Sequence, residues 1–183
     1  QGLLGRLKSA SVKAVLGQIG RVFAKEGVHL LDSSSFLKHL LCPKGVLTVE
    51  RPSEAQQADI RFGMQAARTV ASLDIGQTVV VKRRVVIAVE ALEGTDAAVR
   101  RAHELAGDGL VVVKLASPSQ DMRFDIPVLG KEGLAVFEES GVACVAVQAN
   151  KTLLLDRDAL VAEANEARMC LVGVEPRFLA PFV

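Results

Sequence analysis

Aromatic residues are scarce in this chain: its 183 residues include no tryptophan, no tyrosine and only seven phenylalanines. Proteins that hold single-stranded nucleic acid stack the bases on aromatic side chains, and this composition offers few such platforms. The charges also balance, with 22 Lys and Arg against 21 Asp and Glu, so no overall positive field attracts a polyanion. We therefore expect no nucleic-acid partner.

Cysteine is nearly as rare. The sequence has three cysteines, Cys42, Cys144 and Cys170, and the last two stand inside apolar runs. An odd number of thiols without paired spacing predicts buried free cysteines in a reducing compartment. No apolar run approaches the ~20 residues of a membrane-spanning helix, and no signal peptide is recognisable, so we expect a cytoplasmic location. Because the chain begins with Gln1, we also expect it to be a fragment of a longer protein.

Several widespread catalytic motifs are missing. The sequence contains no Gly-x-x-x-x-Gly-Lys phosphate loop, no Gly-x-Ser-x-Gly nucleophile elbow and no His-Glu-x-x-His or other zinc-ligand spacing. Phosphate-loop, serine-hydrolase and zinc-protease chemistries are therefore not indicated. Any chemistry has to come from local clusters of charged residues.

Helical periodicity dominates the first part of the chain. Apolar residues recur at steps of three and four in residues 1–26, which predicts one amphipathic helix or two short ones packed on the protein's own core. The basic polar face leaves peripheral contact with a membrane as the alternative. Further along, Ser53 and Gln56 fit a capping box and predict a helix to about Leu73. Three charged residues of that second helix are expected to be exposed to solvent: Asp59, Arg61 and Arg68.

The pattern then changes to apolar runs that alternate with helical segments. Residues 78–81 and 85–89 are predicted to form a hairpin around a basic turn that lacks Asn-Gly, with the second strand buried on both faces. The alternation favours an α/β fold, with a mostly parallel or mixed sheet flanked by helices and preceded by a helical linker segment. The other predicted helices span 36–41, 95–106, 131–140 and 156–167, and the other predicted strands span 110–116, 142–148, 152–155 and 169–174.

The loop after residues 85–89 carries three carboxylates within residues 90–96. Gly94 permits a close backbone approach, Thr95 is placed to cap the following helix, and Asp96 falls in its first turn. Amide groups at a helix start bind oxyanions, and the Thr95 hydroxyl adds a donor. The alternative is an ordinary capped helix in which Asp96 complements the dipole.

The loop after residues 110–116 is more specific. Lys114 stands in an otherwise apolar strand, where its charge is costly unless an anion or a carboxylate pairs with it. Asp121 and Asp125 offer hard oxygen ligands for Mg²⁺. Lys114 and Arg123 are placed to neutralise phosphate oxygens, and a structural Asp–Arg ion pair is the equal alternative. Because ligands of open α/β sheets bind beyond the carboxyl ends of the strands, both loops are candidates for one site.

Several short motifs occur in a fixed order along the chain. They are Asp74-Ile-Gly-Gln77, Ala88-Val-Glu-Ala-Leu-Glu-Gly-Thr-Asp96 with Arg101, Val113-Lys114, Gln120-Asp121-x-Arg123-x-Asp125-x-Pro127 and Leu171-Val-Gly-Val174. In this combination the stretch from roughly Val46 to Val174 resembles the C-terminal region of LpxI-type UDP-2,3-diacylglucosamine pyrophosphatases. The segment Leu129-Gly-Lys-Glu-Gly133 departs from the family's Gly-Pro-x-Thr form, so no substrate contact is assigned to it.

The resemblance implies an activity and a domain plan. The activity is hydrolysis of the pyrophosphate bond of UDP-2,3-diacylglucosamine to UMP and 2,3-diacylglucosamine 1-phosphate, a step of lipid A synthesis in Gram-negative bacteria that depends on Mg²⁺ or another divalent cation. The family has two domains, so residues 1–45 are expected to be a helical linker and residues 46–183 the C-terminal catalytic and lipid-binding domain. The family's N-terminal domain is then expected as a partner outside this chain. The enzyme is expected to be free in the cytoplasm or peripheral to the inner membrane. A homodimer is one alternative for its assembly.

Taken with the charge arguments, the resemblance leads to a hypothesis about individual residues. In this hypothesis the catalytic residues are Asp121 and Asp125. The acyl chains lie against the helices before Leu73 and against Phe124. The metal ligands are Asp96, Asp121 and Asp125, the phosphate ligands are Thr95, Lys114 and Arg123, and the contacts to sugar or acyl-amide groups are Gln77 and Gln120.

Two other classes of function stay open. The first is a non-catalytic module that binds a phosphorylated lipid or nucleotide without turning it over. The second is a structural interaction domain, in which the loops of Lys114 and Asp125 pair only with each other.

Overall fold

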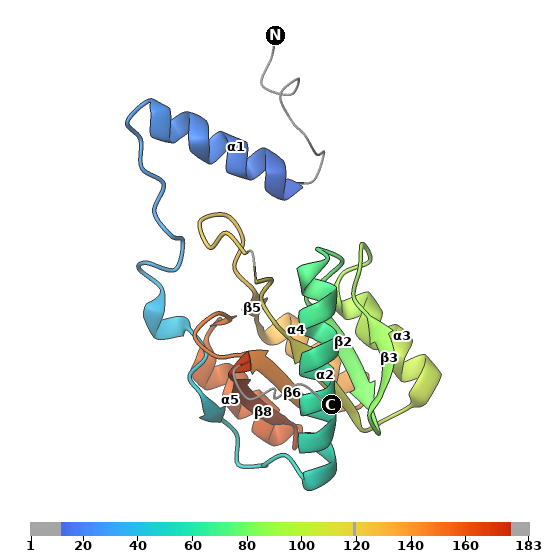
Figure 1. Cartoon of the computed structure of the whole chain (residues 1–183). Helices are drawn as coiled ribbons and strands as arrows, with labels where there is room; N and C mark the ends of the chain where they lie inside the picture. Colours follow the sequence, from blue (N-terminus) through green and yellow to red (C-terminus); the bar gives the residue numbers. More distant parts are fainter. Residues whose placement is uncertain (1–11, 119, 177–183) are drawn as a thin grey trace.

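A computed structural model describes residues 12–118 and 120–176 (Figure 1). The part of the first predicted helix within residues 1–11 lies outside the described residues. The helices are α1 (Val12–Lys25), the short 3-10 helix η2 (Lys38–Leu40), α2 (Glu54–Ser72), α3 (Thr95–Ala106), α4 (Lys131–Glu139) and α5 (Arg157–Glu166). The strands are β1 (Gly45–Val46), β2 (Thr78–Lys82), β3 (Val85–Val89), β4 (Leu110–Lys114), β5 (Val128–Leu129), β6 (Val142–Gln148), β7 (Leu153–Leu154) and β8 (Cys170–Val174).

Six of these strands form one mixed sheet, in the order β1-β8-β6-β4-β2-β3. Its centre is parallel, because β4 pairs with β6 and β6 with β8 in the same direction. Its two margins are antiparallel: β2 pairs with β4 and β3, and β1 pairs with β8. The predicted α/β fold is confirmed, and of the two predicted sheet types the mixed one is present. A second, two-stranded parallel sheet joins β5 to β7.

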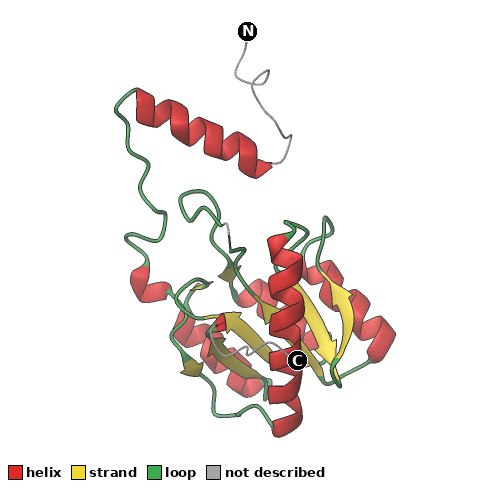
Figure 2. Ribbon diagram, in the orientation of Figure 1, coloured by secondary structure: helices red, strands yellow, loops and turns green. Residues whose placement is uncertain are grey.

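The helices cover the two faces of the sheet as separate layers (Figure 2). Helix α2 packs on one face, where its apolar side chains join those of alternate residues of β2 and β4. Helices α3, α4 and α5 pack on the other face, around Phe137 and Leu160. The capping box that begins α2 is present, with Ser53 and Gln56 each bonding the other's backbone amide, as the sequence predicts. All three cysteines are buried and free, also as predicted.

The prediction that β3 is buried on both faces is wrong. β3 is an edge strand, and its first residue, Val85, is 56% exposed. The strand buried on both faces is β2, because the hairpin places it between β3 and β4. The two strands have similarly apolar sequences, so composition does not reveal which of them forms the edge.

Asp59 was predicted to be solvent-exposed, and this is also wrong. Its side chain is only 6% exposed, and its carboxylate accepts hydrogen bonds from the backbone amides of Arg83 (3.0 Å) and Arg84 (2.5 Å). These two arginines form the turn between β2 and β3. Arg61 and Arg68, the other two α2 residues predicted to be exposed, are exposed.

Helix α1 stands apart from the sheet, above the loop that joins β4 to β5 (Figure 1). Gly27, which follows the helix, takes a left-handed φ of 76°, a conformation that suits a helix end. The short helix predicted at 36–41 is reduced to η2. Within residues 12–118 and 120–176, no helix is long and apolar enough to cross a membrane.

Candidate functional site

Three segments meet at one end of the sheet, where the candidate site lies. β3 and β4 both run antiparallel to β2, so the residues after β3 and β4 lie beside the residues before β2. Glu90 follows β3, Lys114 ends β4, and Gln77 precedes β2. The sequence-based expectation that the two charged loops share one edge of the sheet is therefore confirmed.

A charged network links the ends of β3 and β4 through one hydroxyl group. The Lys114 ammonium donates to Thr95 Oγ1 (2.9 Å), and the Thr95 hydroxyl donates to Glu90 Oε1 (2.7 Å). Thr78 adds a second hydroxyl, 3.4 Å from both Lys114 Nζ and Thr95 Oγ1. The anion predicted to offset the charge of Lys114 is thus present, and it is the carboxylate of Glu90.

Burial and neighbouring charges act in opposite directions on Glu90. Burial raises the pKa of its carboxyl group, but the Lys114 charge and hydrogen bonds from Thr78, Thr95 and the Gln77 amide outweigh burial. The net effect holds the pKa below its ordinary value of 4.5. Glu90 is therefore a carboxylate at neutral pH, linked to the ammonium of Lys114 through the Thr95 hydroxyl.

Thr95 does not cap α3 as predicted. The N-cap residue is Gly94, which takes a φ of 84° and makes no side-chain capping hydrogen bond. The Thr95 hydroxyl instead hydrogen-bonds the charged groups of Glu90 and Lys114. Asp96 lies in the first turn of α3 as predicted, exposed to solvent.

A second network surrounds Asp125 in the loop after β4. Its Oδ2 accepts from the side-chain amide of Gln120 and from that of Gln77 (3.3 Å). Gln120 also donates to the Asp125 carbonyl, and its own oxygen accepts from the amide of Ser117 (2.9 Å). No described residue bonds the other carboxylate oxygen, Asp125 Oδ1. The two glutamines thus fix the position of Asp125 and leave one of its oxygens accessible to a ligand.

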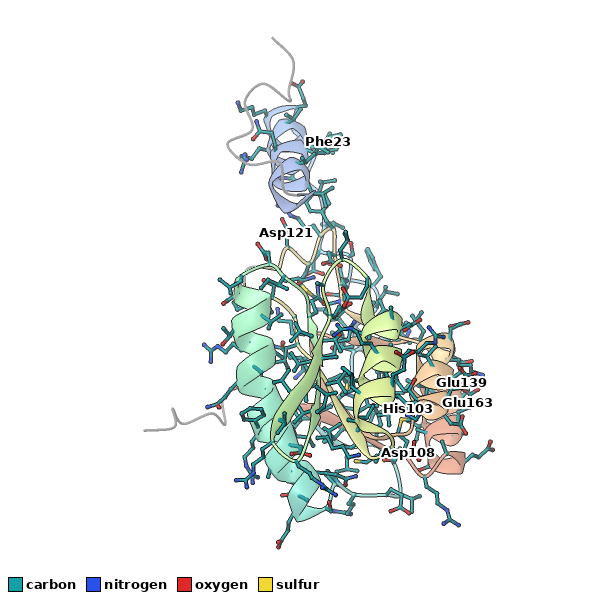
Figure 3. All side chains as sticks on the ribbon, turned by 90° about the vertical axis from the view of Figure 1, so that its right-hand side faces the viewer. Phe23, His103, Asp108, Asp121, Glu139 and Glu163 are labelled. Carbon is teal, nitrogen blue, oxygen red and sulfur yellow. The ribbon has the colours of Figure 1, made fainter. Side chains whose placement is uncertain are left out.

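Asp121 and Arg123 form a two-point ion pair with each other. Arg123 Nε donates to Asp121 Oδ1 (2.9 Å), and a terminal nitrogen of the same guanidinium donates to Oδ2 (2.6 Å). This hydrogen bonding lowers the pKa of the Asp121 carboxyl group and raises the pKa of Arg123. The Asp–Arg pair that the sequence left as an alternative is thus present here, at the base of helix α1 (Figure 3, Asp121 labelled).

Two hollows adjoin at this end of the sheet and share the wall formed by Gly76, Gln77 and Asp125. The larger, of about 380 Å³, is partly apolar and has Ala71 and Phe124 in its lining. Leu16 of α1 also lines it. The smaller, of about 300 Å³, contains both Glu90 and Lys114. We call these the apolar hollow and the charged hollow.

The carboxylates proposed as metal ligands are only partly brought together. Asp121 and Asp125 both line the apolar hollow, whereas Asp96 lines neither hollow. Across residues 12–118 and 120–176 there is no group of three His, Cys, Asp or Glu close enough to hold a metal ion. Mg²⁺ is commonly held by one or two carboxylates together with substrate phosphates, and Asp125 Oδ1 offers such an oxygen. The donor set therefore suits an ion that arrives with a phosphate ligand rather than a site made by protein alone.

Most of the chain is similar to known proteins. Residues 43–172 match the family model of the LpxI C-terminal domain. The chain belongs to this family. It is also similar to the UDP-2,3-diacylglucosamine pyrophosphatase LpxI of Caulobacter vibrioides, at 33% identity over 172 residues. That match covers 90% of this chain and 61% of the relative, so the chain spans less than two thirds of the relative's length.

Two residues of the site had no assigned role in the sequence-based hypothesis. Glu90 is one, and its signal was a carboxylate directly after an apolar strand, in the same motif as Thr95. Gly76 is the other: a Cβ there would lie 2.0 Å from the Glu90 carbonyl oxygen, so only glycine lets the two segments approach. Gly76 belongs to the motif Asp74-Ile-Gly-Gln77. The sequence does not show that this motif lies against Glu90, so the need for a glycine at this position could not be predicted.

Proposed function

We propose that the chain forms the part of a hydrolase that binds UDP-2,3-diacylglucosamine and cleaves its pyrophosphate bond. The observation that carries the proposal is the junction of the two hollows at Gln77 and Asp125. A diphosphate that joins a diacylated sugar to a nucleoside needs a charged seat beside an apolar one. The relative of this chain is named for that substrate.

The proposed phosphate ligands are Lys114, which lines the charged hollow, and Thr95, which is hydrogen-bonded to it. Lys114 is held by the hydroxyl of Thr95 rather than by a direct ion pair, so its ammonium keeps hydrogen-bonding capacity for an incoming anion. Glu90, behind Thr95, fixes the hydroxyl's orientation. A positive group preset at the point where charge develops stabilises the transition state without further reorganisation.

Asp125 is the proposed catalytic residue. Its free oxygen, Oδ1, would receive a proton from the attacking water or hold a divalent ion, while the amides of Gln77 and Gln120 keep the carboxylate in place. The water oxygen adds to one phosphorus, the P–O bond to the bridging oxygen breaks, and the bridging oxygen leaves with its electron pair. The products are UMP and 2,3-diacylglucosamine 1-phosphate.

A bound Mg²⁺ would supply charge neutralisation at the phosphates, and Asp125, with Asp121, is the group that would hold it. The ion pair with Arg123 occupies both oxygens of Asp121, so Asp121 joins such a site only if Arg123 turns to the phosphates. This exchange of partners gives Arg123 its proposed second role as a phosphate ligand.

The proposal is tested by assaying UMP release with the chain alone and with the family's N-terminal domain added, in the presence of Mg²⁺ or of a chelator. We expect UMP to appear in the presence of both domains and Mg²⁺. Saturable binding of UDP-2,3-diacylglucosamine without UMP under every condition would identify a non-catalytic binding module instead. The acyl seat is tested with Phe124→Ala, which should weaken binding of the diacylated substrate more than binding of UMP.

A further inference from the structure

A third hollow lies at the opposite end of the sheet from the candidate site. It has a volume of about 690 Å³ and is lined by Ala58, Arg61, Phe62, Gln65, Arg83 and Arg84. β2 runs from Thr78, at the candidate site, to Lys82, next to the turn that carries Arg83 and Arg84. Two separate hollows thus lie at the two ends of one strand, and we call this one the arginine hollow.

The turn at the arginine hollow has an unfavourable backbone conformation. Arg83 and Arg84 take left-handed φ values of 53° and 59°, as a two-residue hairpin turn of this type requires. Asn and Gly are the usual residues there, and a side chain such as arginine costs about 1–2 kcal/mol in each left-handed position. Asp59 offsets this cost by binding both backbone amides of the turn. The turn is therefore fixed in place while carrying two long cations where other residues would be easier to accommodate.

The three guanidinium groups of the arginine hollow have no ion-pair partner among the described residues. Arg61, Arg83 and Arg84 are all exposed, and both oxygens of Asp59, the carboxylate beneath them, are engaged by the turn amides. Phe62 supplies an apolar wall and Gln65 a further hydrogen-bonding group. A guanidinium group binds two phosphate oxygens through two parallel hydrogen bonds. A rigid backbone beneath the arginines lowers the entropy cost of ordering their side chains around a ligand.

We propose that the arginine hollow is a second anion site, which takes a small soluble phosphate or diphosphate compound rather than the diacylated substrate. The residues that line the hollow come from one helix and one turn. The surface they offer is small for a protein partner, because a typical protein interface buries about 800 Å² on each side. An anionic bilayer is the rival ligand. The location argues against it, because a membrane held at the arginine hollow would lie at the far end of β2 from the site proposed to receive a lipid.

The test uses inorganic pyrophosphate as the probe and the arginine side-chain NMR signals of the intact chain as the readout. We expect titration to shift the Nε signals of Arg61, Arg83 and Arg84, and to leave that of Arg68 unchanged. Arg68 is a matched reference, since it is exposed on the same helix but does not line the hollow. Shifts confined to other arginines, or no shift, would overturn the proposal.

Variants separate this site from the charged hollow. Arg61→Gln should weaken pyrophosphate binding at the arginine hollow by about tenfold, the effect of losing one charge-assisted hydrogen bond, whereas Arg68→Gln should not. Lys114→Met removes the cation of the other hollow and should leave the three arginine shifts intact. Equal effects of Arg61→Gln and Arg68→Gln, or loss of the shifts in Lys114→Met, would contradict a separate site. Binding to vesicles of anionic phospholipid without any response to pyrophosphate would likewise overturn it in favour of a membrane surface.

Discussion

Lys114 and Glu90 are joined through the hydroxyl of Thr95, which accepts from the ammonium at 2.9 Å and donates to the carboxylate at 2.7 Å. This relationship combines the ends of two strands and the start of a helix in one hydrogen-bonded unit. Lys114 alone would be a costly charge near the core, and Glu90 alone would be a half-buried anion. Together they form a polar seat whose geometry is set before any ligand arrives.

The first prediction concerns the coupling between these two residues. Lys114→Met leaves the half-buried Glu90 without its cation and should lower the free energy of unfolding by about 1–3 kcal/mol. Glu90→Gln in the Lys114→Met background removes the uncompensated charge. The double variant should therefore lose less unfolding free energy than the sum of the losses in the two single variants. Urea denaturation of the four proteins measures this, and strictly additive costs would show that the two residues do not interact.

The second prediction concerns pH. Because the pKa of Glu90 is lower in the folded protein than its ordinary value of 4.5, its charged form contributes stability above that value. The contribution is lost as the pH falls through the lower folded pKa, since Glu90 is then protonated in both states. Glu90→Gln should therefore destabilise the protein at pH 7 and have much less effect once the pH lies below the folded pKa of Glu90. A stability difference that does not change between the two conditions would contradict the assigned pKa shift.

The third prediction addresses the arginine turn. Replacing Arg83 and Arg84 with the favoured Asn-Gly pair should raise the free energy of unfolding by about 1 kcal/mol, because the left-handed strain is relieved. Asp59→Ala should lower it by about 2–3 kcal/mol, because two turn amides lose their acceptor. The cost of Asp59→Ala should be smaller in the Asn-Gly background. An equal cost in both backgrounds would mean that Asp59 does not serve to hold the strained turn.

The fourth prediction compares two helical glycines. A Cβ at Gly63 of α2 would lie 2.6 Å from Val113 Cγ2, whereas at Gly133 of α4 the nearest atom is Leu129 Cδ1 at 3.7 Å. Gly63→Ala should therefore destabilise the fold by about 1–3 kcal/mol through overpacking. Gly133→Ala should stabilise it by about 0.5–1 kcal/mol through helix propensity. Thermal unfolding of both variants tests the packing of α2 on the sheet, and the same sign for both would contradict it.

Much of the fold was predictable from the sequence because its signals are local. The capping box of Ser53 and Gln56, the apolar strands and the alternation of strands and helices each depend on residues close together in the chain. The edge position of β3 was not predictable, since it depends on which strand pairs with β4. The burial of Asp59 was missed for a similar reason: its partners are amides of a turn 24 and 25 residues further along.

The candidate site shows the same division. Its place at the ends of β3 and β4 followed from the strand order, and the unusual position of Lys114 predicted a nearby anion. The identity of that anion did not follow, because several carboxylates lie close in sequence and only the tertiary structure selects Glu90. Thr95 was predicted as a helix cap, but a charged pair from two other segments competes more strongly for its hydroxyl.

We infer that Asp125 performs catalysis at the junction of the two hollows. The most direct measurement is the steady-state hydrolysis of UDP-2,3-diacylglucosamine by the assembled enzyme carrying Asp125→Ala. As a control, Asp158→Ala changes a fully exposed carboxylate of α5. We expect Asp125→Ala to lower kcat by at least about 10²–10³-fold, with substrate binding and thermal stability largely unchanged. Asp158→Ala should behave as the wild type. Wild-type kcat in a folded Asp125→Ala protein would contradict a catalytic role for Asp125.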